Sequence, residues 1–240
     1  MSSKSNSKNQ VIDLNKPYTC SFCQKNFARE STLVSHVCEA KRRHQAKNEP
    51  AVKLAMVAFQ QFQASLKPGK TVVCTYQEFC ASNLYTTFVR IGAWALEHQV
   101  QEFNSWVKYL LREAVKLDRW CDVHTYREYL KHLLDSEPAD QAIERSLKTM
   151  ENWGMDTGNP WQDFFRVVNT NVACNWIQSG RISAWMLYNA PSAIHLLERC
   201  NQEQLTWIQE TAPSRKWRVK FMRYQEESDA IRASLVQAGL

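Results

Sequence analysis

The chain has 240 residues, of which 44% are hydrophobic, and it carries a formal net charge of +6. This length suffices for one sizeable domain together with a small module. No run of 18 apolar residues occurs and the first ten residues are polar, so we expect a cytoplasmic protein without a signal peptide or a membrane span.

The basic excess is concentrated in the N-terminal fifth of the chain. The first 50 residues contain nine Lys or Arg against four Asp or Glu, whereas the rest of the chain contains 21 against 20. Any attraction for phosphate is therefore expected near the N-terminus. Residues 1–16 are polar and are predicted to form a disordered arm.

A short stretch after this arm has the spacing of a metal-binding module. Cys20 and Cys23 are separated by two residues and can present two thiolates to one metal ion. The interval before His36 is long enough for a hairpin return and the start of a helix. Phe27 and Leu33 supply the minimal apolar core of such a module, which is usually unfolded without its metal. The spacing predicts one bound Zn2+.

Two residues compete to be the fourth ligand. Cys38 lies two positions after His36, and His44 lies eight positions after it. On a continuous helix the first step rotates by roughly 200° and the second climbs roughly 12 Å, so neither suits one unbroken helix. Cys38 requires only that the helix unwinds at His36, and it would complete a closed Cys3His set of the structural type. We therefore prefer Cys38 and keep His44 as the alternative.

Beyond residue 50 the sequence predicts helices. The apolar spacing favours a helix over 52–66, ended by the Lys67-Pro68-Gly69 sequence, and another over 103–114. Asn159 followed by Pro160 predicts a helix start, with the apolar stripe continuing to Trp176 and a stop at Gly180.

The predicted fold class is mostly α. Only six Gly and seven Pro occur in the chain, which disfavours a turn-rich β architecture, and about seven to nine helices are expected from the usual helix length of ~11–12 residues. The organisation expected is a small ββα-like zinc finger with a basic tail over 17–46, followed by an irregular multi-helix domain over 51–240.

Two further patterns leave alternatives open. Thr75 and Thr125 each precede a Glu by three residues, as in a capping box, and the two boxes reflect either coincidence or an internal duplication. The segment 216–221 alternates basic and apolar residues. We prefer a helix there, with Trp217, Phe221 and Tyr224 in the core, over a strand or a surface that stacks nucleic-acid bases.

The sequence contains no motif for phosphate binding, dinucleotide binding, serine hydrolysis or zinc proteolysis. We therefore expect that the protein is not an enzyme. Four histidines stand singly, and the five cysteines outside the module are expected to be buried free thiols. The nine Trp are predicted to serve the core or an interface. The single histidines are His98, His124, His132 and His195, and the five cysteines are Cys74, Cys80, Cys121, Cys174 and Cys200.

The candidate nucleic-acid contacts are Arg29, which could address a guanine, and Lys25, Lys41, Arg42 and Arg43, which could meet phosphate. The alternative, which we slightly prefer, is that the last three form a solvated basic tail after a structural finger. One finger covers only ~3 base pairs, too few for specific binding alone. The expectation is weak, non-specific binding to nucleic acid.

The residues from Tyr18 to His36 resemble a single Cys-Cys-His-His zinc finger whose fourth ligand is altered. Together with the Cys38-Glu39-x-Lys41-Arg42-Arg43 tail, they are similar to small zinc-finger proteins of large contractile-tailed bacteriophages, one family of which assists assembly of the baseplate hub. That resemblance implies a non-enzymatic morphogenesis factor with protein partners in the host cytoplasm. The alternatives are a nucleic-acid-binding regulatory protein that uses the basic finger and a zinc-containing processing enzyme.

Overall fold

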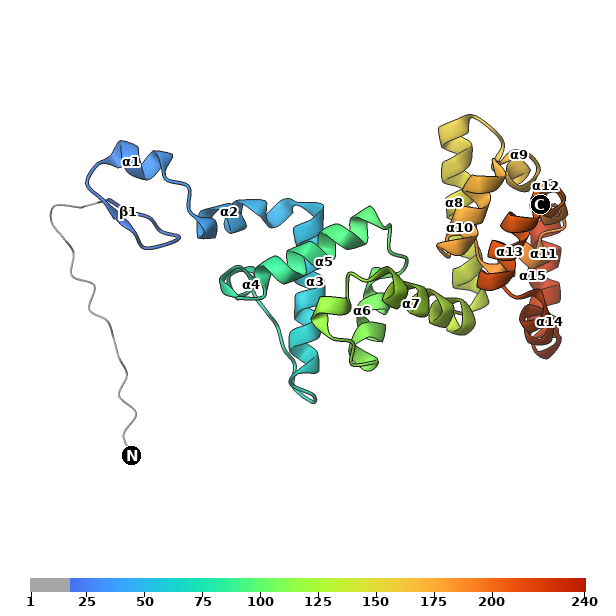
Figure 1. Ribbon diagram of the computed structural model, residues 1–240, viewed down its shortest axis with the longest axis horizontal. Coiled ribbons are helices and arrows are strands. Elements are labelled where there is room, and N and C mark those ends of the chain that lie inside the picture. The colour runs from blue at the N-terminus through green and yellow to red at the C-terminus, as the bar shows by residue number, and fades with distance from the viewer. Residues whose placement is uncertain (1–17) are drawn as a thin grey trace. The chain divides into compact units, whose positions relative to one another are not determined.

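The computed structural model describes residues 18–240 and is mostly α, as predicted (Figure 1). Within this range it contains fifteen α-helices and one two-stranded sheet. Thirteen of these helices begin at or after Pro50, so the seven to nine expected for that part of the chain were too few. Short caps and turns divide the apolar stripes into more pieces than periodicity shows. The predicted arm over residues 1–16 lies outside the described range. None of the helices described is long and apolar enough to cross a lipid bilayer.

The chain divides into two compact units. The first runs to Val100 and takes in Leu111–Leu117, and the second comprises Gln101–Leu110 and Asp118–Leu240. The helices predicted to form one domain over 51–240 are therefore shared between both units. The first unit contains β1 (Tyr18–Thr19), β2 (Asn26–Phe27), α1 (Glu30–Ser35), α2 (Glu39–Gln45), the 3-10 helix η1 (Ala46–Asn48), α3 (Pro50–Ser65), α4 (Tyr76–Ala81) and α5 (Tyr85–Glu97).

Helices α3 and α5 pack side by side and form the core of the first unit (Figure 1). Pro50 occupies the first turn of α3, where its missing N–H costs no hydrogen bond, and the helix ends just before the predicted Lys67-Pro68-Gly69 stop. Phe59, Phe79 and Phe88 are buried and their rings lie in contact. The capping box predicted at Thr75 is confirmed at the start of α4.

Gly92 allows the close approach of α3 and α5. A Cβ atom at this position would lie 2.1 Å from the backbone oxygen of Ala51, so the two helices would have to separate. We expect Gly92→Ala to lower the free energy of unfolding by about 1–3 kcal/mol, the usual cost of overpacking. This loss would occur although Ala favours the helix over Gly by ~1 kcal/mol.

Urea denaturation followed by circular dichroism measures the effect. Ala93→Ser, at the exposed next position of the same helix, is the control and should change the free energy of unfolding by no more than ~0.5 kcal/mol. Equal or greater stability of Gly92→Ala would contradict the close packing of these helices.

The remaining elements follow in chain order. They are α6 (Phe103–Arg112), the 3-10 helix η2 (Leu117–Arg119), α7 (Val123–Ser136), α8 (Ala139–Thr157), the 3-10 helix η3 (Trp161–Asp163), α9 (Phe164–Val167), α10 (Thr170–Gln178), α11 (Ala184–Asn189), α12 (Ala193–Arg199), α13 (Gln202–Thr211), α14 (Ser214–Arg223) and α15 (Gln225–Gln237). In the second unit, α8 packs against α9 and α11, and α10 packs against α13.

The continuous helix predicted after Asn159 is wrong. Pro160 precedes only one 3-10 turn and the short α9, and Asn169 then starts α10 because its side chain accepts the backbone N–H groups of Asn171 and Val172. Gly180 has a left-handed φ of 75° just after α10, which agrees with its predicted role as a stop.

The second predicted capping box is also wrong. Asp122 caps α7 by accepting the backbone N–H groups of His124 and Thr125, so Thr125 lies inside the first turn and donates its own hydroxyl to Asp122. The two Thr-Glu pairs therefore have different structural roles. This difference removes the sequence argument for an internal duplication.

Tryptophans fill much of the core of the second unit. Trp106, Trp120, Trp153, Trp185 and Trp217 are buried, and the other four in the chain are half-buried. The segment around Trp217 is helix α14, as preferred from the sequence, and Phe221 packs against Trp185 and Trp217. Trp217 and Phe221 thus belong to the core, whereas Tyr224, which was predicted to lie there too, is 47% exposed.

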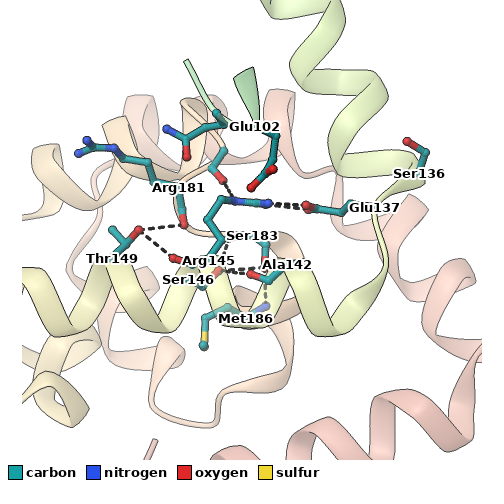
Figure 2. Close-up of polar contacts among 12 residues, drawn as sticks. Glu102, Ser136, Glu137, Ala142, Arg145, Ser146, Thr149, Arg181, Ser183 and Met186 are labelled. Carbon is teal, nitrogen blue, oxygen red and sulfur yellow. Dashed lines mark hydrogen bonds and ion pairs between the residues drawn. The ribbon is translucent and has the colours of Figure 1, made fainter. Parts of the chain in front are cut away.

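A buried ion pair joins the end of α7 to α8 (Figure 2). The guanidinium of Arg145 donates to both carboxylate oxygens of Glu137, at 2.5 and 2.8 Å, and its Nε donates to the backbone oxygen of Gly180 at 2.7 Å. At the next residue of α8, the hydroxyl oxygen of Ser146 accepts the backbone N–H of Ser183 at 2.9 Å. These bonds fix the loop before α11 onto α8.

Candidate metal centre

A tight hairpin turn presents the first two cysteines. Strands β1 and β2 pair antiparallel, with Tyr18 opposite Phe27. Between them, the backbone N–H of Cys20 donates to the backbone oxygen of Lys25 at 2.9 Å, and the backbone N–H of Gln24 donates to the backbone oxygen of Cys20 at 2.8 Å. Gln24 adopts a left-handed φ of 59°, which closes the turn. The predicted hairpin return is confirmed.

Helix α1 brings His36 to the cysteines and ends there. The backbone of His36 is extended, with φ −70° and ψ 121°, and its N–H donates to the oxygen of Leu33 at 3.1 Å. The ring of His36 lies 4.6 Å from that of Phe27. The helix therefore unwinds at the residue where ligation by Cys38 requires it to unwind.

Cys38 has two structural roles. Its backbone is extended and begins α2, and its sulfur accepts the backbone N–H of Lys41 at 3.4 Å. A hydrogen bond from a backbone N–H stabilises a thiolate, as outer partners of metal ligands commonly do. The same side chain thus faces the other ligand residues and caps the following helix.

The four side chains converge with the dimensions of a tetrahedral site. The ligand atoms of Cys20, Cys23, His36 and Cys38 all lie within 4.8 Å of one another. The sulfurs of Cys20 and Cys38 are 4.0 Å apart, and the sulfur of Cys23 lies 3.2 Å from Nε2 of His36. Metal–sulfur bonds of about 2.3 Å in a tetrahedron give an edge of roughly 3.8 Å, which fits. The sulfur separation is far longer than a disulfide bond of about 2.05 Å.

A backbone hydrogen bond favours the ionised form of Cys20. The N–H of Cys23 lowers the pKa of the Cys20 thiol and outweighs the opposite effect of burial of this residue, which is only 3% exposed. Metal binding needs the thiolate rather than the thiol. Three thiolates and one imidazole form a closed set of four protein ligands that can hold a metal ion without an open position.

His44, the alternative ligand, lies outside this group. Its ring centroid is 5.1 Å from that of Phe22 and 6.4 Å from that of Tyr76. It therefore packs between the hairpin turn and α4. Within residues 18–240, the four ligand residues form the single cluster of three or more His, Cys, Asp or Glu side chains with this spacing.

Arg43 has a structural contact that the sequence did not reveal. Its guanidinium donates to the backbone oxygens of Cys80 at 2.9 Å and Ser82 at 3.4 Å, at the end of α4, and lies 4.6 Å from the ring of Tyr85. The hydroxyl of Tyr76 donates to the backbone oxygen of Arg43. These contacts satisfy carbonyls at a helix end and anchor α2 on α4. The i, i+4 spacing of Glu39 and Arg43 was the only local signal.

Two of the other predicted phosphate contacts have partners within the module. The ammonium of Lys41 donates a hydrogen bond to the backbone oxygen of His36 at 3.3 Å. The guanidinium of Arg42 forms an ion pair with Glu39 at 3.4 Å on the exposed side of α2. Arg29 is exposed before α1, and the ammonium of Lys25 lies 5.8 Å from the ring of Phe27.

The cysteines outside the site are mostly less buried than expected. Cys174 is buried, and burial raises the pKa of its thiol to about 12, which makes it a poor nucleophile. The other four are half-buried: Cys74, Cys80, Cys121 and Cys200. Among the single histidines, His98 stacks on Trp94 and His132 stacks on Tyr109, while His124 and His195 lie near carboxylates.

Comparison with protein-family models, with curated protein sequences and with solved structures gave no match. The ligand assignment rests on the residues and their geometry.

Proposed function

We propose that this protein is a non-enzymatic interaction protein in which one Zn2+ organises the N-terminal module. The observation that carries the proposal is the double role of Cys38, as a ligand residue and as the cap of α2. Because Arg43 anchors α2 on α4, the metal fixes residues 18–38 against a helical support. Three thiolates and one imidazole suit Zn2+, and a closed site gives the ion a structural rather than a catalytic role.

A protein partner is supported by the surface of the module. Val34 is 71% exposed and Val37 is 59% exposed, and both flank the ligand His36. Phe22 adds a third exposed apolar side chain beside the knuckle. Apolar side chains held outward by a metal-bound fold are typical of a protein contact. Assembly of a phage tail baseplate, which the sequence resemblance implies, is the specific form of this proposal.

Specific nucleic-acid recognition receives less support. Arg43 is held by carbonyls of α4, and Lys41 is held by the backbone of His36. Fewer phosphate contacts therefore remain than the basic tail alone would provide. The proposal keeps only weak, non-specific binding to nucleic acid.

The ligand set is tested by metal competition. The protein should bind one Zn2+ per chain, and Cys38→Ser should weaken binding by at least ~10-fold, because loss of a ligand or even of its hydrogen-bond partner costs that much. His44→Ala should leave the affinity unchanged within ~2-fold, since that ring lies outside the site. A chelating dye measures both. The opposite order of the two variants would overturn the assignment.

The interaction role is tested by affinity capture from the native source. Wild type, Cys38→Ser and His44→Ala are compared, each with and without nuclease. The proposal predicts a small set of proteins that survives nuclease and is lost with Cys38→Ser alone. If the captured proteins disappear on nuclease treatment, the result would favour the hypothesis of a nucleic-acid-binding protein. If Cys38→Ser captures the same proteins as wild type, the module does not hold the partner.

A further inference from the structure

A groove in the second unit lies between α14 and α15 and is bordered by α11. Its volume is about 460 Å³, within the range of ~300–1,000 Å³ that accommodates ligands or side chains of a partner. Arg218 and Met222 are four residues apart on α14, and Asp229 and Arg232 are three apart on α15, so each pair shares a helix face. The lining includes Tyr188, Arg218, Phe221, Met222, Asp229 and Arg232.

The groove carries positive charge without internal partners. Helix α14 contains five Lys or Arg and no Asp or Glu in ten residues. Lys216 pairs with Asp135, whereas Arg218 and Arg232 form no ion pair or hydrogen bond with any described residue. Asp229 is the one carboxylate in the lining, against two guanidiniums. The groove therefore attracts a ligand that brings carboxylates or another anionic group.

The groove also exposes apolar surface. Met222 is 74% exposed, beside the partly buried ring of Phe221. Methionine adapts its shape to apolar side chains of a partner, and arginine and tyrosine are enriched at protein contacts. A ligand with both acidic and apolar side chains would satisfy both features of this surface.

The surroundings disfavour a nucleic acid. Few aromatic faces are open for stacking on bases, because Trp217 is buried, Phe221 is only partly exposed, and the exposed Tyr224 lies in an acidic hollow beside the groove. Glu226, Glu227 and Asp229 line the adjoining hollow at the start of α15 and would repel a continuous phosphate backbone. A peptide can instead place its carboxylates only beside the two arginines.

We propose that this groove binds an acidic amphipathic peptide segment of a partner protein, with its carboxylates on Arg218 and Arg232 and its apolar side chains on Met222 and Phe221. The groove lies outside the unit that contains the metal site. This second interaction surface is therefore independent of the ligand assignment.

The test selects peptides from a random phage-displayed library on the full chain. The selected peptides should combine Asp or Glu with apolar residues. They should bind Arg218→Glu/Arg232→Glu at least ~10-fold more weakly, as expected for a charge contact at the centre of an interface. Arg127→Glu/Lys131→Glu, which makes the same charge change on the exposed side of α7, should bind them as wild type does. Circular dichroism confirms that the variants are folded, and Arg218→Gln/Arg232→Gln repeats the test without reversing charge.

Three outcomes would overturn the proposal. These are selected peptides without an acidic excess, equal binding to wild type and to the groove variants, and failure to select any peptide that depends on the groove. An oligothymidylate that binds wild type but not the groove variants, where no peptide does, would assign the surface to single-stranded nucleic acid instead. Retention of peptide binding by Cys38→Ser would show that this surface acts without the metal module.

Discussion

Removing the proposed Zn2+ from the full chain is expected to unfold residues 18–38 and to leave α3 and α5 folded. Cys20 is the one buried hydrophobic residue in that segment, and Phe27 and Leu33 are only half-buried. Such a small core cannot hold the chain, whereas structural zinc contributes about 10–16 kcal/mol of apparent binding free energy in comparable peptides. Hydrogen exchange read by mass spectrometry, with and without a chelator, measures the loss of protection.

Helix α2 should lose only part of its protection from hydrogen exchange after chelation. Its start loses an ordered cap when Cys38 is released, but Arg43 and Tyr76 still tie it to α4. We therefore expect faster exchange over 39–41 than over 43–45 after chelation. His44→Ala serves as the control, because it should not alter the response to chelator. Unchanged protection of 18–38, or loss of protection in α3 and α5, would contradict this account.

Breaking the buried ion pair of the second unit should have the next largest effect. Arg145→Met leaves the carboxylate of Glu137 buried, with its side chain 2% exposed, and removes the bond to the backbone of Gly180. An uncompensated buried charge costs about 3–5 kcal/mol. Chemical denaturation should show a loss of this size in the free energy of unfolding.

Two comparisons separate charge from packing. Glu137→Leu/Arg145→Met removes both charges and should cost less than Arg145→Met alone, since no unpaired carboxylate remains. Arg166→Met removes an exposed pair with Asp163 and should cost no more than ~1 kcal/mol. A loss below ~1 kcal/mol for Arg145→Met would show that water or another group compensates Glu137.

The clustering of the four candidate ligand residues was predictable because the interactions that bring them together are local. The Cys-x2-Cys spacing fixes a turn, and helix geometry alone showed that Cys38 needs an unwound residue at His36. The structure has that unwinding. The mostly α class and the end of α3 were predictable for the same reason, since periodicity and a Pro-Gly stop act over a few residues.

What the sequence did not reveal depends on distant partners. In the sequence, Arg43 belongs to a basic tail, yet its hydrogen-bond partners Cys80 and Ser82 are 37 and 39 positions away. Arg145 meets Gly180 at a separation of 35 positions. Local capping explains other misses. Asp122 caps α7 in place of Thr125, and Asn169 starts a second helix ten residues after Asn159, because each of these side chains accepts two free backbone N–H groups.

X-ray absorption at the zinc edge of the metal-loaded full chain tests the central claim most directly. The assignment predicts a first shell of three sulfurs at about 2.3 Å and one nitrogen at about 2.0–2.1 Å, unchanged in His44→Ala. Two sulfurs and two nitrogens, a shell containing water oxygen, or a spectrum that changes in His44→Ala would contradict the closed site of Cys20, Cys23, His36 and Cys38.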